Sequence, residues 1–208
     1  METDHLTAVA PLTGARDVFA RNVELLRLPP RVALFYSRAR RFATASGDEW
    51  SLVSATKPES LVHLLRLARG RSLVAEIGTG TAWTTIALAL ADRRRRVVSF
   101  DPVVRPERDD YLRLVGRSAR SRIELIAGPG EAGAGAVAGP VDMLFVDGSH
   151  ERERTIATFE AWRPAIGPGG IIAFHDFGNP GYPGVGEAIA ALGLEGEVVR
   201  DVFVWRAP

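Results

Sequence analysis

The sequence has no cysteine among its 208 residues and almost no net charge. The absence of cysteine excludes disulfides, thiolate metal sites, iron–sulfur clusters and a cysteine nucleophile. Lysine and arginine number 26 and aspartate and glutamate 25, which gives a formal charge of +1. A protein that holds nucleic acid mainly through its phosphates needs an excess of basic residues. The composition therefore gives no support to a nucleic-acid partner.

Long hydrophobic runs are also missing. The first ten residues, METDHLTAVA, contain early acids and no apolar run, so they do not form a signal peptide. No stretch approaches the length of a membrane span. Hydrophobic residues still make up 46% of the chain, enough for one substantial core. We expect one cytoplasmic globular domain over residues 1–208, with no membrane partner.

The apolar pattern divides this domain into two parts. Residues 1–70 show helical spacing over about 12–28, 32–42 and 58–70, with an expected loop over 44–56. Residues 71–208 instead alternate short apolar runs with helical segments, and the expected strands cover 73–77, 97–100, 123–127, 142–146, 171–174 and the region 198–205. Near-continuous apolar runs are typical of parallel strands covered on both faces. The pattern predicts an α/β fold: a doubly wound, mostly parallel, seven-stranded Rossmann-like sheet with an N-terminal helical extension.

A glycine turn follows the first expected strand. Gly78 and Gly80 stand between the apolar run and an alanine-rich helix, the arrangement that opens a nucleotide-binding α/β domain. The third glycine of a dinucleotide fingerprint would fall at position 83, where this chain has Trp83. Glu76, just before the turn, is a poor neighbour for a phosphate and suits a ligand with an amino or sulfonium group. The loop therefore favours a cationic cofactor over a dinucleotide.

Polar residues gather at the carboxyl ends of the other expected strands, where open α/β sheets bind ligands. Asp101 ends the second strand, 25 residues after Glu76, and is positioned to accept ribose hydroxyls. The remaining strand ends carry Gly128-Pro129-Gly130, Asp147 with His150, and His175 with Asp176. His175 has a second interpretation, as a residue that orients Asp176 or packs within the strand.

The acid–x–Gly–x–Gly form of residues 76–80 resembles the first motif of class I S-adenosylmethionine-dependent methyltransferases. The segments 141–150, VDMLFVDGSH, and 168–177, PGGIIAFHDF, extend the resemblance. Together they are similar to the macrocin-type and other sugar O-methyltransferases and, more distantly, to the divalent-metal-dependent catechol-type O-methyltransferases. The resemblance covers about residues 58–185.

This resemblance implies a site. The implied contacts to S-adenosylmethionine are Glu76, Gly78, Thr79, Gly80, Thr84, Asp101, Gly130 and Asp147. In these families the acids after the fourth and fifth strands, here Asp147 and Asp176, hold Mg²⁺, and the position of His150 carries the general base. The implied catalytic residues are therefore His150, Asp147 and Asp176. Phe177 stands where many members have a further Asp or Asn ligand, so the need for a metal stays open.

The implied reaction is methylation of a hydroxyl on a small molecule such as a sugar, a natural product or a phenol. An NAD-linked short-chain oxidoreductase would need a Tyr-x-x-x-Lys pair, but no tyrosine precedes Lys57, the single lysine, at that spacing. A DNA amino-methyltransferase would need an Asn/Asp-Pro-Pro-aromatic run in place of Asp147-Gly-Ser-His150. A non-catalytic module that binds adenosylmethionine or a partner stays open as the alternative. So do the identity of the acceptor and assembly into a homo-oligomer.

Overall fold

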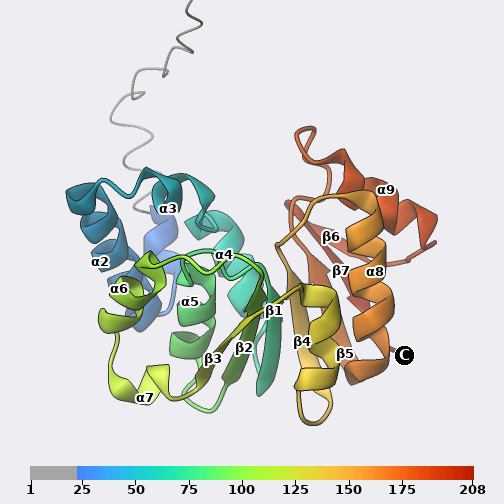
Figure 1. Ribbon diagram of the computed structural model, residues 1–208, viewed down its shortest axis with the longest axis horizontal. Coiled ribbons are helices and arrows are strands. Elements are labelled where there is room, and N and C mark those ends of the chain that lie inside the picture. Colours follow the sequence, from blue (N-terminus) through green and yellow to red (C-terminus); the bar gives the residue numbers. More distant parts are fainter. Residues whose placement is uncertain (1–22) are drawn as a thin grey trace, which may run out of the picture.

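The computed structural model describes residues 23–208 as a seven-stranded sheet between two layers of helices (Figure 1). The strands are β1 (Leu73–Ile77), β2 (Arg96–Asp101), β3 (Ile123–Ala127), β4 (Val141–Val146), β5 (Ile166–Phe174), β6 (Glu197–Val199) and β7 (Val202–Arg206). The helices are α2 (Pro30–Ser46), α3 (Glu49–Ser54), α4 (Pro58–Leu67), α5 (Trp83–Ala91), α6 (Glu107–Arg113), α7 (Arg117–Arg120), α8 (Arg152–Trp162) and α9 (Pro183–Ala191), with short 3-10 turns η1 (Gly130–Ala136) and η2 (Arg163–Ala165). The fold predicted from the sequence is confirmed.

The strand order is β3-β2-β1-β4-β5-β7-β6. Strands β1 to β5 pair in parallel, and β7 joins β5 and β6 in antiparallel fashion. The chain runs outward from β1 through β2 to β3, then returns to place β4 on the other side of β1. The boundary between β1 and β4 is therefore the topological switch point, where ligands bind in folds of this kind.

Three expected local elements differ from the structure. The expected loop at 44–56 contains α3, which begins because the Asp48 carboxylate accepts a 3.0 Å hydrogen bond from the amide of Ser51. The small-residue-rich segment 133–139, whose composition predicts a loose connection, lies partly within η1 (Gly130–Ala136). Strand β5 begins at Ile166, five residues earlier than expected, because the pairing with β4 shifts register after Val141 and accommodates the glycines within the strand.

The two helical layers bury different faces of the sheet. Helices α2, α4 and α5 cover one face, and α8 and α9 cover the other (Figure 1). The first helical segment expected from the sequence lies mostly outside the described residues, although residues 23–27 are helical. The helical spacing over 32–42 predicts Leu34 on the inward face, but Leu34 is 51% exposed. No helix within residues 23–208 is long and apolar enough to span a bilayer.

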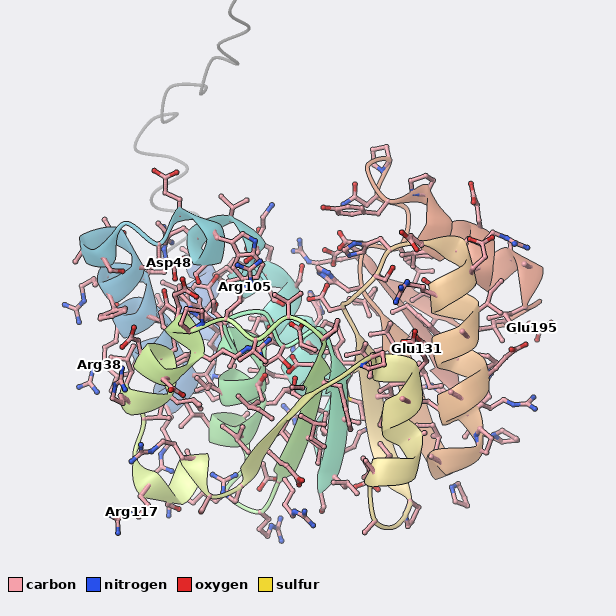
Figure 2. All side chains as sticks on the ribbon, viewed as in Figure 1. Arg38, Asp48, Arg105, Arg117, Glu131 and Glu195 are labelled. Carbon is pink, nitrogen blue, oxygen red and sulfur yellow. The ribbon has the colours of Figure 1, made fainter. Side chains whose placement is uncertain are left out.

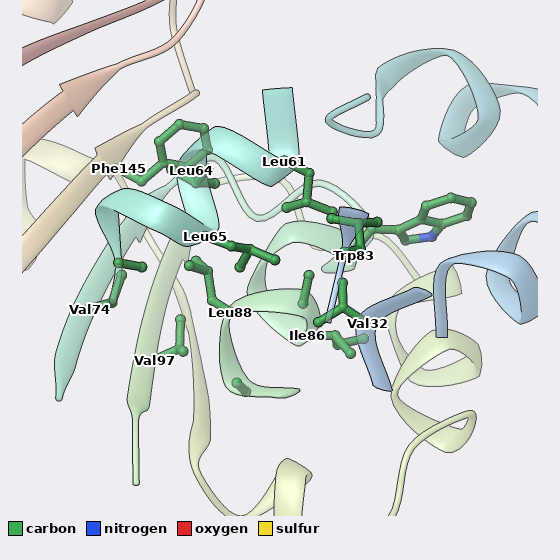
Figure 3. Close-up of a cluster of buried hydrophobic side chains, with 14 of the residues drawn as sticks. Val32, Leu61, Leu64, Leu65, Val74, Trp83, Ile86, Leu88, Val97 and Phe145 are labelled. Carbon is green, nitrogen blue, oxygen red and sulfur yellow. The ribbon is translucent and has the colours of Figure 1, made fainter. Parts of the chain in front are cut away.

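Trp83, at the start of α5, ties the N-terminal helices to the sheet (Figure 3). Its ring is 4% exposed and packs edge-on against Phe35 and Tyr36 of α2 and Tyr111 of α6. Trp83 thus faces the helical layer and leaves the glycine turn clear. The N-terminal helices and the α/β region consequently share one hydrophobic core.

Candidate active site

A cavity of about 1030 Å³ opens at the carboxyl ends of β1, β2, β4 and β5. Most binding pockets for small ligands enclose about 300–1,000 Å³, so this volume suits a cofactor together with an acceptor. Helix α3, the β2–α6 loop, η1 and the loop after β5 complete its walls. Figure 2 labels two of its wall residues, Arg105 beside α3 and Glu131 on η1 next to α8.

The glycine turn needs its glycines for different reasons. Gly78 has φ of 96°, and a Cβ at this position would lie 2.0 Å from the carbonyl oxygen of Asp147. Only a residue without a side chain allows β1 and β4 to approach this closely at the switch point. Gly80, with φ of 51°, lies beneath the Trp50 ring of α3, and a Cβ there would be 3.0 Å from that ring. The glycine turn therefore packs closely against the end of β4 through Gly78 and against α3 through Gly80.

Glu76 occupies a different place from the other expected cofactor contacts. Its side chain is fully buried, outside the cavity wall, and one carboxylate oxygen accepts hydrogen bonds from Thr85 and, at 2.6 Å, from Ser99. The other oxygen has no hydrogen-bond partner among the described residues. The expectation that Glu76 contacts the cofactor directly finds no support, because its carboxylate joins β1, β2 and α5 beneath the glycine turn.

Burial raises the pKa of Glu76 to about 7, although the hydrogen bonds from Ser99 and Thr85 oppose the shift. The folded state thus holds a proton that the unfolded chain releases near its ordinary value of 4.5. This contribution to stability is complete below pH 4.5 and is lost as the pH rises through about 7. Relative to Glu76→Gln, the wild-type protein should lose about 3 kcal/mol of unfolding free energy between about pH 4 and about pH 8. Urea denaturation of both proteins across this range measures the difference, and parallel pH profiles would contradict it.

Asp101 lies at the cavity wall, as expected for a ribose contact, but it also bonds to the protein. One of its oxygens accepts from the amide of Gly80 at 2.9 Å and from Arg108 at 2.8 Å, and the other accepts from the amide of Val103 at 2.8 Å. A carboxylate has about four acceptor sites, so one remains for a ligand in this conformation. The geometry supports a bond to one ribose hydroxyl, whereas the sequence suggested bonds to both.

Sequence analysis missed Arg108, whose contacts explain the shape of this wall. The side chain is 5% exposed and donates to the Gly80 carbonyl, the Val103 carbonyl and Asp101. Arg108 therefore fastens the glycine turn to the end of β2. Its position on a short, charged helix resembles an ordinary solvated arginine, and only the tertiary fold brings it to the site.

The other expected cofactor residues line the cavity. Thr79 pairs with Ser99 through their hydroxyls at 2.7 Å, and Thr84 pairs with Thr56 at 2.8 Å, so both side chains are held in place. Gly130 packs against Ile77, where a Cβ would lie 2.2 Å from its side chain. Asp147 forms part of the wall directly opposite Gly78, because their backbones meet.

Asp147 and Asp176 come together around His175. The Nδ1 atom of His175 lies 2.9 Å from Asp147 Oδ1 and 3.1 Å from Asp176 Oδ2, and its Nε2 atom lies 3.3 Å from Asp201 Oδ2. Burial alone would lower the pKa of His175, but the three carboxylates outweigh it and raise the pKa to about 12. Asp201, which lies in the β6–β7 turn, is a member of this cluster that sequence analysis missed, and Ser60 of α4 donates to it at 3.0 Å.

His150 joins the cluster from the β4–α8 loop. Its Nε2 atom lies 3.1 Å from Asp176 Oδ2, and its ring stacks on Tyr182 with centroids 3.9 Å apart. Burial would raise the pKa of Asp176, but His150, His175 and Asn179 hold it well below its ordinary value. The backbone of Asp176 is left-handed, with φ of 57°, a conformation that aspartate tolerates better than most residues. The three expected catalytic residues thus share one wall of the cavity.

Phe177 does not face this cluster as a ligand would. Its ring packs on Phe203 of β7 with centroids 5.4 Å apart, and its amide donates to the Asp201 carbonyl. The ligand atoms of Asp147, His175 and Asp176 nevertheless lie within 4.8 Å of one another. Two carboxylates and an imidazole are an acceptable donor set for a divalent cation, so the residues present fit such an ion.

Comparisons with known proteins agree with this geometry. Residues 75–177, about half of the chain, match the family model described as a methyltransferase domain. A search of curated proteins finds no match.

Several solved structures share the fold at low sequence identity. A TDP-rhamnose 3'-O-methyltransferase of calicheamicin biosynthesis is 17% identical, with 98% of this chain and 99% of that chain covered and a TM-score of 0.58. A caffeoyl-CoA O-methyltransferase homologue from Staphylococcus aureus is 14% identical, with 93% and 99% covered and a TM-score of 0.67. An O-methyltransferase from Bacillus cereus, solved with S-adenosylhomocysteine, is 20% identical, with 92% and 96% covered and a TM-score of 0.62. With the domain match and the glycine turn at the switch point, these findings place the chain in the class I S-adenosylmethionine-dependent methyltransferases.

Proposed function

We propose that this methyltransferase transfers the methyl group of S-adenosylmethionine to a hydroxyl of a small molecule. The observation that carries the proposal is the His150–Asp176 pair, at 3.1 Å, on the wall of a cavity large enough for both reactants. Two of the similar structures bear the names of O-methyltransferases that act on a sugar nucleotide or a coenzyme A ester, which supports the same class of reaction.

The cofactor supplies a sulfonium methyl group that is already reactive. The protein must hold an acceptor in line with it and remove the hydroxyl proton. His150 Nε2 lies 3.1 Å from Asp176 Oδ2 as an ion-pair contact, without hydrogen-bond geometry in this conformation. With the ring proton on Nε2, beside the carboxylate, the other ring nitrogen, Nδ1, is an acceptor. His150 then takes the proton as the oxygen–carbon bond forms and the carbon–sulfur bond breaks. The Asp176 carboxylate stabilises the resulting imidazolium.

The contacts around His150 hold its ring in one orientation. Tyr182 stacks on one face with an angle of 19° between the ring planes, and Gly184 at the start of α9 packs against the His150 carbonyl. Tyr182 is 42% exposed and lines the cavity, so it also offers a surface for the acceptor. Asp147 and Asp176 would hold a divalent cation, whose chemistry would be to lower the pKa of the acceptor hydroxyl.

The proposal is tested by incubating the protein with S-adenosylmethionine labelled in its methyl group and a panel of hydroxylated sugars, nucleotide sugars and phenols. We expect the label to appear as a methyl ether on at least one class of acceptor. Exclusive transfer to nitrogen or carbon, or to RNA, would overturn the proposal.

Asp101 should govern cofactor affinity. Asp101→Ala removes the acceptor of a ribose hydroxyl and releases Arg108 and the Gly80 amide, so S-adenosylhomocysteine should bind about 10–100-fold more weakly. Isothermal titration calorimetry measures this loss. Asp109→Ala, an exposed acid on α6, is the matched control and should bind as the wild-type protein does. Equal affinities for all three proteins would remove Asp101 from the cofactor site.

A further inference from the structure

The cluster around His175 has the arrangement of a metal site with a nitrogen ligand. We propose that Asp147 Oδ1, Asp176 Oδ2 and His175 Nδ1 form three ligands on one face of a first-row transition metal ion such as Mn²⁺ or Co²⁺. This inference rests on the cation site of the proposed function and extends it by naming the third ligand and the class of ion.

The distances within the cluster support a shared ion. Neighbouring ligands of an octahedral ion with bonds of about 2.1 Å lie about 3 Å apart. His175 Nδ1 is 2.9 Å from Asp147 Oδ1 and 3.1 Å from Asp176 Oδ2, which matches that spacing at both edges. Without an ion, the proton of a charged histidine joins the two carboxylates, and a bound metal ion would take the place of that proton.

The groups behind the ligands strengthen the argument. Metal-bound histidines usually donate their second ring N–H to a carboxylate. The carboxylate next to this nitrogen is Asp201, whose Oδ2 lies 3.3 Å from His175 Nε2 as an ion-pair contact, without hydrogen-bond geometry in this conformation. Asp201 is itself held by Ser60, and Asp176 accepts from Asn179 at 2.8 Å. Asp176 thus has a hydrogen-bond partner that fixes its orientation, and His175 has a carboxylate beside its second ring nitrogen.

This arrangement also accounts for Phe177. The family pattern places a further Asp or Asn ligand there, whereas this chain has an aromatic ring that packs on Phe203. His175, two residues earlier, supplies the ligand from the end of β5. The replacement of an oxygen ligand by an imidazole changes the preferred metal, since imidazole suits transition ions and Mg²⁺ favours oxygen.

Mn²⁺ binding to the metal-free full chain tests the inference. Pulsed electron paramagnetic resonance of the Mn²⁺ complex should show coupling to a nitrogen nucleus, which His175→Gln should abolish. The same variant should weaken Co²⁺ binding at least 10-fold in calorimetry while Mg²⁺ affinity changes by less than about 3-fold. Asp201→Asn should keep the nitrogen coupling and weaken Co²⁺ about 10-fold or more.

Two controls make the outcome decisive. His63→Gln removes a histidine of α4 outside the cluster and should leave the signal and the affinities unchanged, and binding of S-adenosylhomocysteine reports that each variant is folded. Bound Mn²⁺ without nitrogen coupling, or with coupling that persists in His175→Gln, would overturn the inference and leave the proposed methyl transfer intact. Failure of the wild-type protein to bind Mn²⁺ or Co²⁺ at millimolar concentration would overturn it as well.

Discussion

His150→Ala is expected to lower turnover about 10²–10⁴-fold, the range typical of a positioned general base. The imidazole lies on the cavity wall, 3.1 Å from Asp176 and stacked on Tyr182. The other imidazole of the described cluster, His175, has three carboxylate neighbours and is therefore less suited to accept a proton. Single-turnover methyl transfer, measured with saturating cofactor, isolates the chemical step from product release. Calorimetry with S-adenosylhomocysteine should show that cofactor binding is retained.

Two further variants separate a base from a structural role. His63→Ala is the matched control, because it removes a half-buried histidine on α4 away from the site and should keep full turnover. Tyr182→Phe keeps the stacked ring and should reduce turnover far less than His150→Ala does. If His150→Ala retains turnover near that of the wild-type protein, another group removes the proton and the assignment of His150 fails.

The sheet could be predicted from the sequence because most of its strands show a local apolar pattern. The runs at β1, β2, β3 and β4 are apolar, short and separated by helical segments, so neither their type nor their order depends on distant contacts. Strand β5 was placed too late because its first half is glycine-rich and gains strand structure only from pairing with β4. Helix α3 was missed for a related reason, since it has six residues and too few apolar positions to show a period.

The site was predictable only where strand ends determine it. Asp101, Asp147 and Asp176 follow strands directly, so the topology alone brings them to one cavity. Arg108 supports the cavity wall through Asp101 from a short surface helix, and Asp201 reaches the cavity from the β6–β7 turn. No local sequence pattern distinguishes either residue. The sequence also did not show which way the Glu76 side chain points. Alternation along β1 places it on the face of the sheet covered by α5, where Thr85 donates to it.

Trp83→Ala should lower the unfolding free energy by about 3–5 kcal/mol, the usual cost of truncating a buried aromatic side chain. The indole is 4% exposed and contacts three aromatic rings, on α2 and α6, with centroids 5.2–6.4 Å away. Its loss would leave a cavity between α5 and the N-terminal helices (Figure 3). Chemical denaturation monitored by far-ultraviolet circular dichroism measures the change.

Trp83→Phe provides the control that links this core to the cofactor site. It keeps an aromatic ring and removes an indole N–H that has no hydrogen-bond partner within residues 23–208, so its cost should be well below that of Trp83→Ala. Trp83 begins α5 directly after the glycine turn, and Ser51 and Thr56 reach Thr81 and Thr84 there through hydroxyl pairs at 2.7 and 2.8 Å. Loosening α2 and α3 should therefore also weaken cofactor binding in Trp83→Ala.

Two outcomes would contradict this account. An unfolding free energy of Trp83→Ala equal to that of the wild-type protein would show that other contacts hold the N-terminal helices. A lower unfolding free energy with unchanged cofactor affinity would show that the N-terminal helices do not shape the glycine turn.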